Sequence, residues 1–189
     1  MVHMNRLEGP ALKAYLLLRR QMMSEACRIR NMDVRTAWDL DRLPTPETVT
    51  YESLLPGPNA ALKIRDLQPK DLGITRNSTT EYGYKFASLS AGENTDEVSK
   101  TIDNGRVVGI YGLLDNTADP ALVQVDVNVG GREARVWPVR PGQSEINDAM
   151  YFLDPIYVVQ AQKLTIDLHM ATAQDEKITF LGLFIEPKE

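Results

Sequence analysis

Residues that most often carry chemistry are scarce in this sequence. Its 189 residues include one cysteine, Cys27, and two histidines, His3 and His169. A single cysteine excludes an intrachain disulfide framework and is typical of a chain that folds in a reducing compartment such as the cytoplasm. The two histidines lack the spacing of metal ligands. We therefore predict no metal site, and we interpret Cys27 as a packing residue and His169 as a solvated loop residue.

Long apolar runs and the common catalytic motifs are also missing. The apolar stretch from Ala14 to Leu18 ends at Arg19 and Arg20, so it is too short for a signal-peptide core or a membrane span. No G-x-S-x-G elbow, phosphate-binding loop or dinucleotide fingerprint occurs. We expect no targeting segment, no transmembrane segment, no cofactor and no enzymatic activity.

Two further groups of residues have plainer interpretations than a site. Gly105, Gly109 and Gly112 lie in or beside one predicted strand, without the helix that follows a nucleotide-binding loop. We interpret them as bulges or close contacts. The oxygen-rich segment 115–120 lacks the spacing of an EF-hand and ends in proline, so turn chemistry accounts for it better than calcium binding does.

Charge is distributed unevenly along the chain. The formal net charge is -5, yet residues 1–45 hold 8 Lys/Arg against 5 Asp/Glu, which leaves 13 against 21 for the remainder. A protein that grips a phosphate backbone needs a basic stripe, so we predict that the acidic remainder does not bind nucleic acid. The opposite signs favour contacts between the basic segment and an acidic neighbour.

Residues 11–30 show the periodicity of an amphipathic helix. Pro10 precedes them, at a position where a first-turn proline is tolerated. At about 100° per residue, six apolar side chains fall on one stripe, and others widen that stripe to half the circumference. The six are Ala11, Tyr15, Leu18, Met22, Ala26 and Ile29. So broad a face indicates packing on a surface or in a bundle rather than a two-stranded coiled coil.

This helix has two principal interpretations. It packs on the chain's own body as an ordinary amphipathic helix, or it docks on a neighbouring subunit. Five of the seven methionines lie in the first 32 residues, and methionine adapts to varied neighbours, which suits the second interpretation. A membrane-surface helix is a third interpretation, which Glu8, Glu25 and Asp33 disfavour by diluting the positive charge.

The remainder divides into a connector and a body. Prolines 46, 56, 58 and 69 predict an extended connector over residues 46–79, with short strands near 49–51 and 61–64. Together with a helical arm over residues 1–45, this leaves a body at residues 80–189.

The body shows the patterns of short strands. Residues 122–129 alternate apolar and polar, and Gly130 and Gly131 then predict a hairpin turn into strand 133–139. Further strands are predicted at 81–89, 106–114, 156–160, 163–168 and 178–185. Residues 90–100 are polar and are interpreted as an exposed loop. Because no helical pattern intervenes, we predict an antiparallel β-sandwich or jelly roll.

The last predicted strand is apolar on both of its faces. Ile178, Phe180 and Phe184 have one parity, whereas Leu181 and Leu183 have the other. Both faces must therefore be covered. The candidates are a central position in the fold, the helical arm or a neighbouring subunit, and the first requires the least.

The order of these parts resembles that of structural proteins of bacterial virus particles. The resemblance rests on the arm NRLEGPALKAYLLLRRQMMSEACRIRNMDVRTAW, the proline-containing connector and the ending LTIDLHMATAQDEKITFLGLFIEP. In that group, small jelly-roll capsid or cement proteins use terminal arms to join neighbouring subunits. The resemblance implies a shell component in the virion, assembled in the host cytoplasm, whose partners are copies of itself or another shell protein. Its sites would be interfaces.

On this hypothesis the arm carries the interface. Its apolar face would bury against a partner, and its arginines would meet acidic patches. The predicted interface residues are Tyr15, Leu18, Met22, Ile29, Arg19, Arg20, Arg28, Arg30 and Arg35. Deleting residues 1–45 should then leave a folded, soluble body that no longer assembles.

A carbohydrate-binding or adhesion module is the alternative. Sandwich domains often present ligands on their end loops, and aromatic rings form stacking platforms for sugars. The candidate rings are Tyr82, Tyr84, Tyr111, Trp137 and Tyr157. Aromatic residues make up 7% of the chain, so most of these rings are expected in the core.

Overall fold

The computed structural model describes residues 9–30, 62–74, 84–139 and 149–187. Within these ranges the chain forms one α-helix, one 3-10 helix and nine strands. In chain order they are α1 (Gly9–Arg30), β1 (Leu62–Asp66), η2 (Pro69–Leu72), β2 (Tyr84–Leu89), β3 (Gly92–Thr101), β4 (Val107–Asp115), β5 (Leu122–Val129), β6 (Arg132–Pro138), β7 (Ala149–Val159), β8 (Lys163–Met170) and β9 (Gln174–Pro187). The predicted helix and most predicted strands are confirmed within two or three residues, whereas β7 and β9 extend several residues further; the strand expected at 49–51 lies outside the described residues.

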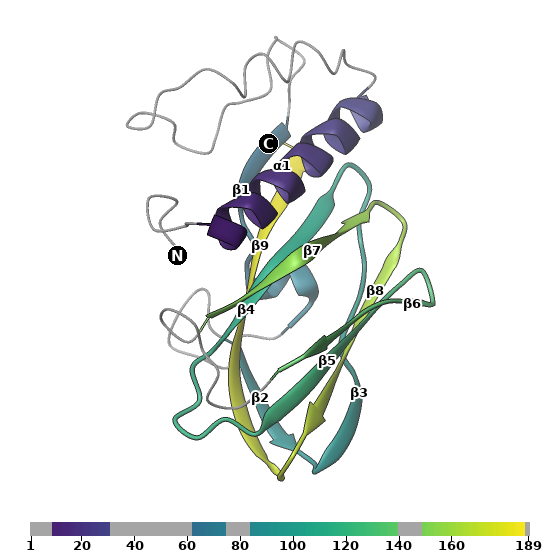
Figure 1. Cartoon of the computed structure of the whole chain (residues 1–189). Helices are drawn as coiled ribbons and strands as arrows, with labels where there is room; N and C mark the ends of the chain where they lie inside the picture. Colours follow the sequence, from purple (N-terminus) through teal and green to yellow (C-terminus); the bar gives the residue numbers. More distant parts are fainter. Residues whose placement is uncertain (1–8, 31–61, 75–83, 140–148, 188–189) are drawn as a thin grey trace.

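The strands form two antiparallel sheets that face each other (Figure 1). Sheet A has the order β1-β9-β4-β7, and β2 pairs with the first part of β9 while β1 pairs with its last part. Sheet B has the order β3-β8-β5-β6. Every pairing is antiparallel. The predicted mainly β, antiparallel sandwich is therefore confirmed.

The pairing of strands follows one rule along the chain. β5 pairs with β6, β4 with β7, β3 with β8 and β2 with β9. The chain is thus one long double-stranded ribbon whose closed end is the β5–β6 turn. Rolling that ribbon adds the pairs β5·β8 and β4·β9 and distributes successive strands between the two sheets. This connectivity is that of a jelly roll.

The closed end of the ribbon is a two-glycine turn. Gly130 and Gly131 both have positive φ angles, 63° and 77°. A two-residue hairpin whose twist matches that of its strands needs positive φ at both central positions, which glycine adopts without steric cost. The predicted hairpin is confirmed, with β5 pairing β6 on either side of the turn.

The main core lies between the sheets. Val125 and Val127 of β5 and Ile166 and Leu168 of β8 are fully buried there. The residues between them in sequence point to the outer face of sheet B and are half-buried. Their period of two is the alternation expected of a sheet with one covered face.

Two segments differ from the sequence interpretation. Residues 92–101 form strand β3 rather than an exposed loop, because backbone pairing with β8 needs no apolar pattern at a sheet edge. Residues 62–72, assigned to the connector, join the body: β1 pairs with β9, and Leu67 and Leu72 are buried in the main core.

The position of strand β9 explains why its sequence is apolar on both faces. It lies inside sheet A, between β4 and the β1/β2 edge. Phe180 and Phe184 face the core between the sheets, whereas Leu181 and Leu183 belong to a second apolar cluster beneath α1. Both a central position and the helical arm thus cover this strand.

Candidate functional site

Helix α1 packs on the outer face of sheet A. Figure 1 shows it lying across β7, β4 and β9, with which it is in contact. Tyr15, Leu18 and Met22 are its buried side chains, and each is at most 3% exposed. Spacings of three and four residues place these side chains on one stripe. They pack against Val107, Tyr111, Ala149, Leu181, Leu183 and Ile185 of the sheet.

Gly109 of β4 permits this close approach. A Cβ atom at Gly109 would lie 2.3 Å from the Met22 sulfur and 2.8 Å from a Leu18 methyl carbon. Gly112 plays the same role within the sheet, where a Cβ would lie 2.4 Å from the Met150 carbonyl oxygen. The interpretation of these two glycines as close contacts is confirmed.

Three tyrosines join the helix to the sheet. The Tyr15 and Tyr111 rings meet edge to face, with centroids 5.5 Å apart. Tyr111 in turn stacks on Tyr151 of β7 at 6.3 Å, with 6° between the ring planes. Burial raises the pKa of the Tyr151 hydroxyl. Such pairs contribute roughly 0.5–1.5 kcal/mol each beyond the burial of their area.

The predicted interface residues of the arm therefore fall into separate environments. Tyr15, Leu18 and Met22 pack against the chain's own sheet. This packing corresponds to the first of the two principal interpretations of the helix. Arg28 is exposed and forms a bidentate pair with Glu25. Arg20 is exposed and Arg19 half-buried, while the side chains of Ile29 and Arg30 and all of Arg35 lie outside the described residues.

The outward side of α1 is apolar as well as basic. Leu16 is 44% exposed and Leu17 is 40% exposed, although both lie beside fully buried Leu18. Around them the helix exposes Lys13, Arg20 and Arg28. We call these five residues the outer face of α1. The two leucines form a small exposed apolar patch among these cations.

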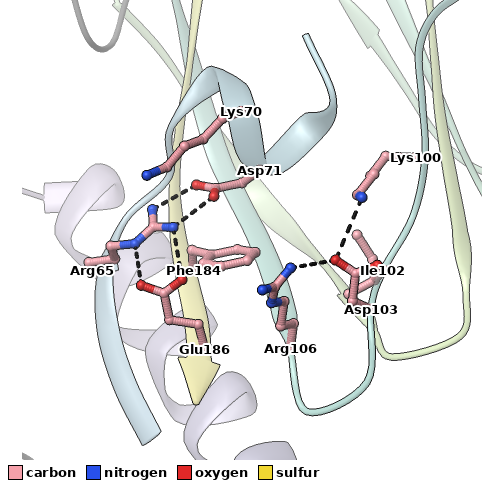
Figure 2. A pocket seen from close by; sticks show the side chains of 9 residues that line it. All are labelled: Arg65, Lys70, Asp71, Lys100, Ile102, Asp103, Arg106, Phe184 and Glu186. Carbon is pink, nitrogen blue, oxygen red and sulfur yellow. Dashed lines mark hydrogen bonds and ion pairs between the residues drawn. The ribbon is translucent and has the colours of Figure 1, made fainter. Parts of the chain in front are cut away.

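A cavity of about 300 Å³ opens where β1 and β9, η2 and the β3–β4 turn meet (Figure 2). Arg65 lines this cavity, and its guanidinium lies 4.5 Å above the centroid of the Phe184 ring. Asp71 and Glu186 both bind this guanidinium, at 2.7 Å and 2.8 Å. Burial disfavours the charge on Arg65, but the hydrogen bonds to these carboxylates outweigh it and raise the pKa of the guanidinium.

The outer face of sheet B carries a polar network. His169 Nε2 lies 2.8 Å from Asp126 Oδ2, and Gln124 donates to the other oxygen of Asp126. Asn128 donates to Asp167, which also accepts the backbone N–H of Asp96. The interpretation of His169 as a loop residue is wrong, because β8 continues to Met170 by pairing with β3 and β5.

A buried carboxylate fixes the β4–β5 turn. Glu176 is fully buried and accepts hydrogen bonds from the Thr117 hydroxyl and the Ala121 N–H. Asp115 accepts the N–H of Thr117. Burial raises the pKa of the Asp115 carboxyl, the hydrogen bonds from Thr117 oppose this rise, and the charge of Glu176 adds to it. Segment 115–120 thus forms a turn held by hydrogen bonds, as its composition predicted.

Most of the candidate aromatic rings that the structure describes lie in the core, as expected. Tyr84, Tyr111 and Trp137 are buried. Trp137 stacks on Phe152 with ring centroids 3.6 Å apart. Tyr157 is 40% exposed, and Tyr82 lies outside the described residues.

The described ranges contain neither a metal-binding cluster nor a membrane-spanning helix. Residues 9–30, 62–74, 84–139 and 149–187 contain no group of three or more His, Cys, Asp or Glu side chains placed to hold a metal ion. Among the helices within those ranges, none has both the length and the apolar character needed to cross a bilayer.

Sequence comparisons give no match to this chain. No protein-family model matches it, and neither does any curated protein.

Solved structures match it weakly. The insecticidal delta-endotoxin Cry8Ea1 of Bacillus thuringiensis aligns with 67% of this chain at 14% identity and a TM-score of 0.36, and the aligned part spans 24% of the toxin. The CBM36-1 domain of a multidomain xylanase from the hindgut metagenome of Trinervitermes trinervoides aligns with 67% of this chain and 99% of its own, at 11% identity and a TM-score of 0.33. The C-terminal domain of EclA, a sugar-binding protein, covers 78% of this chain and 96% of its own, at 11% identity and a TM-score of 0.30. Likenesses of this size carry no information about a ligand or a partner.

Proposed function

We propose that this chain is a structural subunit of a virus particle, a capsid or cement protein of a bacterial virus, and that it acts through contacts between subunits rather than by catalysis. The observation that carries the proposal is the outer face of α1. This helix has already buried one stripe on sheet A, yet Leu16 and Leu17 remain 44% and 40% exposed on its other side. A soluble monomer gains nothing from two adjacent exposed leucines, whereas a repeated subunit contact buries them.

Charge supports a second copy as the partner. The outer face of α1 is basic, while edge strand β3 of sheet B exposes Glu93 and Asp96. These two surfaces lie on different parts of the molecule, so their contact would join subunits head to tail. Head-to-tail contacts close into rings or shells when the rotation between subunits permits it. The jelly-roll fold is compatible with this role, since it occurs in viral capsid subunits, but it also occurs in lectins.

The test compares particle mass between variants. We expect the unaltered chain to form assemblies whose mass rises with concentration, measured by mass photometry and light scattering. The double substitution Leu16→Ser and Leu17→Ser should reduce them to the 21.2 kDa monomer. Val136→Ser is the matched control, because Val136 is 41% exposed on β6 of the other sheet. Equal assembly by the double variant and the control would contradict the proposal.

A carbohydrate-binding module is the second candidate, and the polar network on sheet B favours it. Carboxylate, amide and imidazole groups lie together on the outer face of this sheet, from the residues Asp126, Asn128, Asp167 and His169. Such groups are suited to hydrogen bonding with sugar hydroxyls. A glycan array probed with the purified chain and with the double variant Asp126→Ala and Asp167→Ala tests this candidate. Binding that is lost in the double variant would support it, and an array without any bound glycan would exclude the sugars displayed.

A further inference from the structure

Besides Arg65, three positively charged side chains line the cavity: Lys70, Lys100 and Arg106. Arg65 forms five hydrogen bonds, two to Asp71, two to Glu186 and one to the Asp66 carbonyl oxygen. A guanidinium has five N–H donors, so all of them are used. Asp71 and Glu186 are likewise committed to Arg65. This cluster joins β1, η2 and β9 and forms one wall of the cavity (Figure 2).

The remaining charges in the cavity do not balance. Lys100 and Arg106 share one carboxylate, because Asp103 Oδ2 accepts from Arg106 and lies 3.6 Å from Lys100 Nζ. Lys70 also lines the cavity, and the residues that the structure describes provide no hydrogen bond or ion pair for its side-chain ammonium. Lys70, Lys100 and Arg106 thus have one carboxylate among them, and the whole lining, with four cations against three carboxylates, carries one net positive charge.

Local structure holds these cations in place. The N–H of Arg106 donates to the Asp103 carbonyl oxygen at 3.2 Å, and Gly105 between them has a φ of 74°. This turn sets Asp103 and Arg106 side by side, and Figure 2 shows Lys100 reaching the same carboxylate. Ile102 and Phe184 form apolar walls and are at most 3% exposed. Apolar walls lower the local dielectric and strengthen an interaction between these cations and an anion.

We propose that this cavity binds a small oxyanion, a carboxylate or phosphate group, through Lys70, Lys100 and Arg106. Lysine and arginine recognise such groups by charge-assisted hydrogen bonds. A volume of about 300 Å³ is at the lower end of ligand cavities and fits a small molecule or one end group of a larger one. Arg65 does not contact the ligand; it positions the wall. The site is separate from the outer face of α1, so it stands whether or not the chain assembles.

The experiment titrates the full chain with inorganic phosphate and, separately, with succinate, by calorimetry at low salt. We expect saturable binding of at least one probe that weakens as sodium chloride is added, since screening reduces a contact between exposed charges. Stronger binding of phosphate would identify a phosphate-bearing ligand, and stronger binding of succinate a carboxylate-bearing one. Failure of both probes to bind saturably would overturn the proposal.

Variants then locate the site. Arg106→Gln and Lys70→Gln should each weaken binding by roughly tenfold or more. Lys85→Gln is the matched control, because Lys85 pairs with Asp175 on the surface outside the cavity. This variant should bind the probe with the same affinity as the unaltered chain. Asp103→Asn should tighten binding several-fold, because it removes the carboxylate that competes for Lys100 and Arg106. Misfolding cannot produce tighter binding, and unchanged or weaker binding by this variant would refute the site.

Discussion

The two sheets of this jelly roll have the same antiparallel pairing but opposite outer faces. Sheet A is covered on both sides, by sheet B and by α1, and β4 accordingly has seven consecutive buried residues from Val107 to Leu113. Within the described residues, sheet B packs on sheet A with one face, and the outward residues of its other face are half-buried, as in β5 from Val125 to Asn128, where buried and half-buried residues alternate. Loss of the period of two in a strand therefore indicates a third layer, while its retention indicates a face open to solvent or to a ligand.

Removing residues 1–30 should have the largest effect on the difference between the outer faces of the two sheets. It would uncover the apolar face of sheet A and delete three buried side chains, each contributing roughly 1.5–3 kcal/mol. The sum is comparable with the whole stability of a domain, which is about 5–15 kcal/mol. We therefore expect the chain without residues 1–30 to aggregate or unfold, in contrast to the soluble body that the assembly hypothesis expects after deletion of residues 1–45. Solubility and circular dichroism of the truncated chain check this, and a soluble, folded product would show that α1 is dispensable.

Substituting Gly182 by alanine should disrupt sheet A itself. A Cβ at Gly182 would lie 2.1 Å from the Gly109 carbonyl oxygen, which belongs to a neighbouring strand and cannot move aside. We expect a loss of about 3 kcal/mol or more in the free energy of unfolding, measured in urea. Gly131→Ala is the control, because its Cβ meets open space and costs only the roughly 1–2 kcal/mol of its left-handed backbone. Similar losses for both variants would disprove the collision.

Substituting Leu18 by alanine tests how firmly the third layer is held. Leu18 is fully buried between α1 and sheet A, so the cavity should cost about 2–5 kcal/mol. The neighbouring Leu17 is 40% exposed, and its substitution by alanine should change the free energy of unfolding by no more than about 0.5 kcal/mol. Equal effects of the two substitutions would mean that α1 does not dock in the orientation described.

The smallest effect concerns Asp115 and depends on pH. Because its pKa is raised in the folded state, its contribution to stability is present at acid pH and is lost as the pH rises through that raised pKa. Asp115→Asn keeps an acceptor for the Thr117 N–H and removes the charge. We expect it to raise the free energy of unfolding at pH 7 by less than about 1 kcal/mol. Its effect should vanish near pH 3, and a stability loss at pH 7 would contradict the sign.

Sequence patterns predicted sheet A and sheet B unequally well. The alternation of Val125 and Val127 identified β5, and the two apolar parities of the last strand required two covers for β9. The sequence did not identify the second cover, because the stripe of Tyr15, Leu18 and Met22 fits the chain's own sheet and a neighbour equally well. It also missed β3, whose polar residues at a sheet edge carry no apolar period.

The sites were predicted less well than the fold, for a physical reason. The cavity gathers Arg65, Asp71, Arg106 and Glu186 from segments far apart in sequence. No local motif marks such a group, because the rolled ribbon alone brings its members together. The burial of Trp137 and Tyr111 agrees with the expectation that most aromatic rings lie in the core, but composition alone could not identify which rings are buried.

The mass of the full-length chain in solution, measured by mass photometry over a range of concentrations, tests the proposed assembly role most directly. The exposed leucines and basic outer face of α1 predict particles of many subunits, with a mass that is a multiple of 21.2 kDa. Raising the salt concentration should shift them toward smaller species, because part of the contact is electrostatic. A monomer of 21.2 kDa at every concentration would contradict the account.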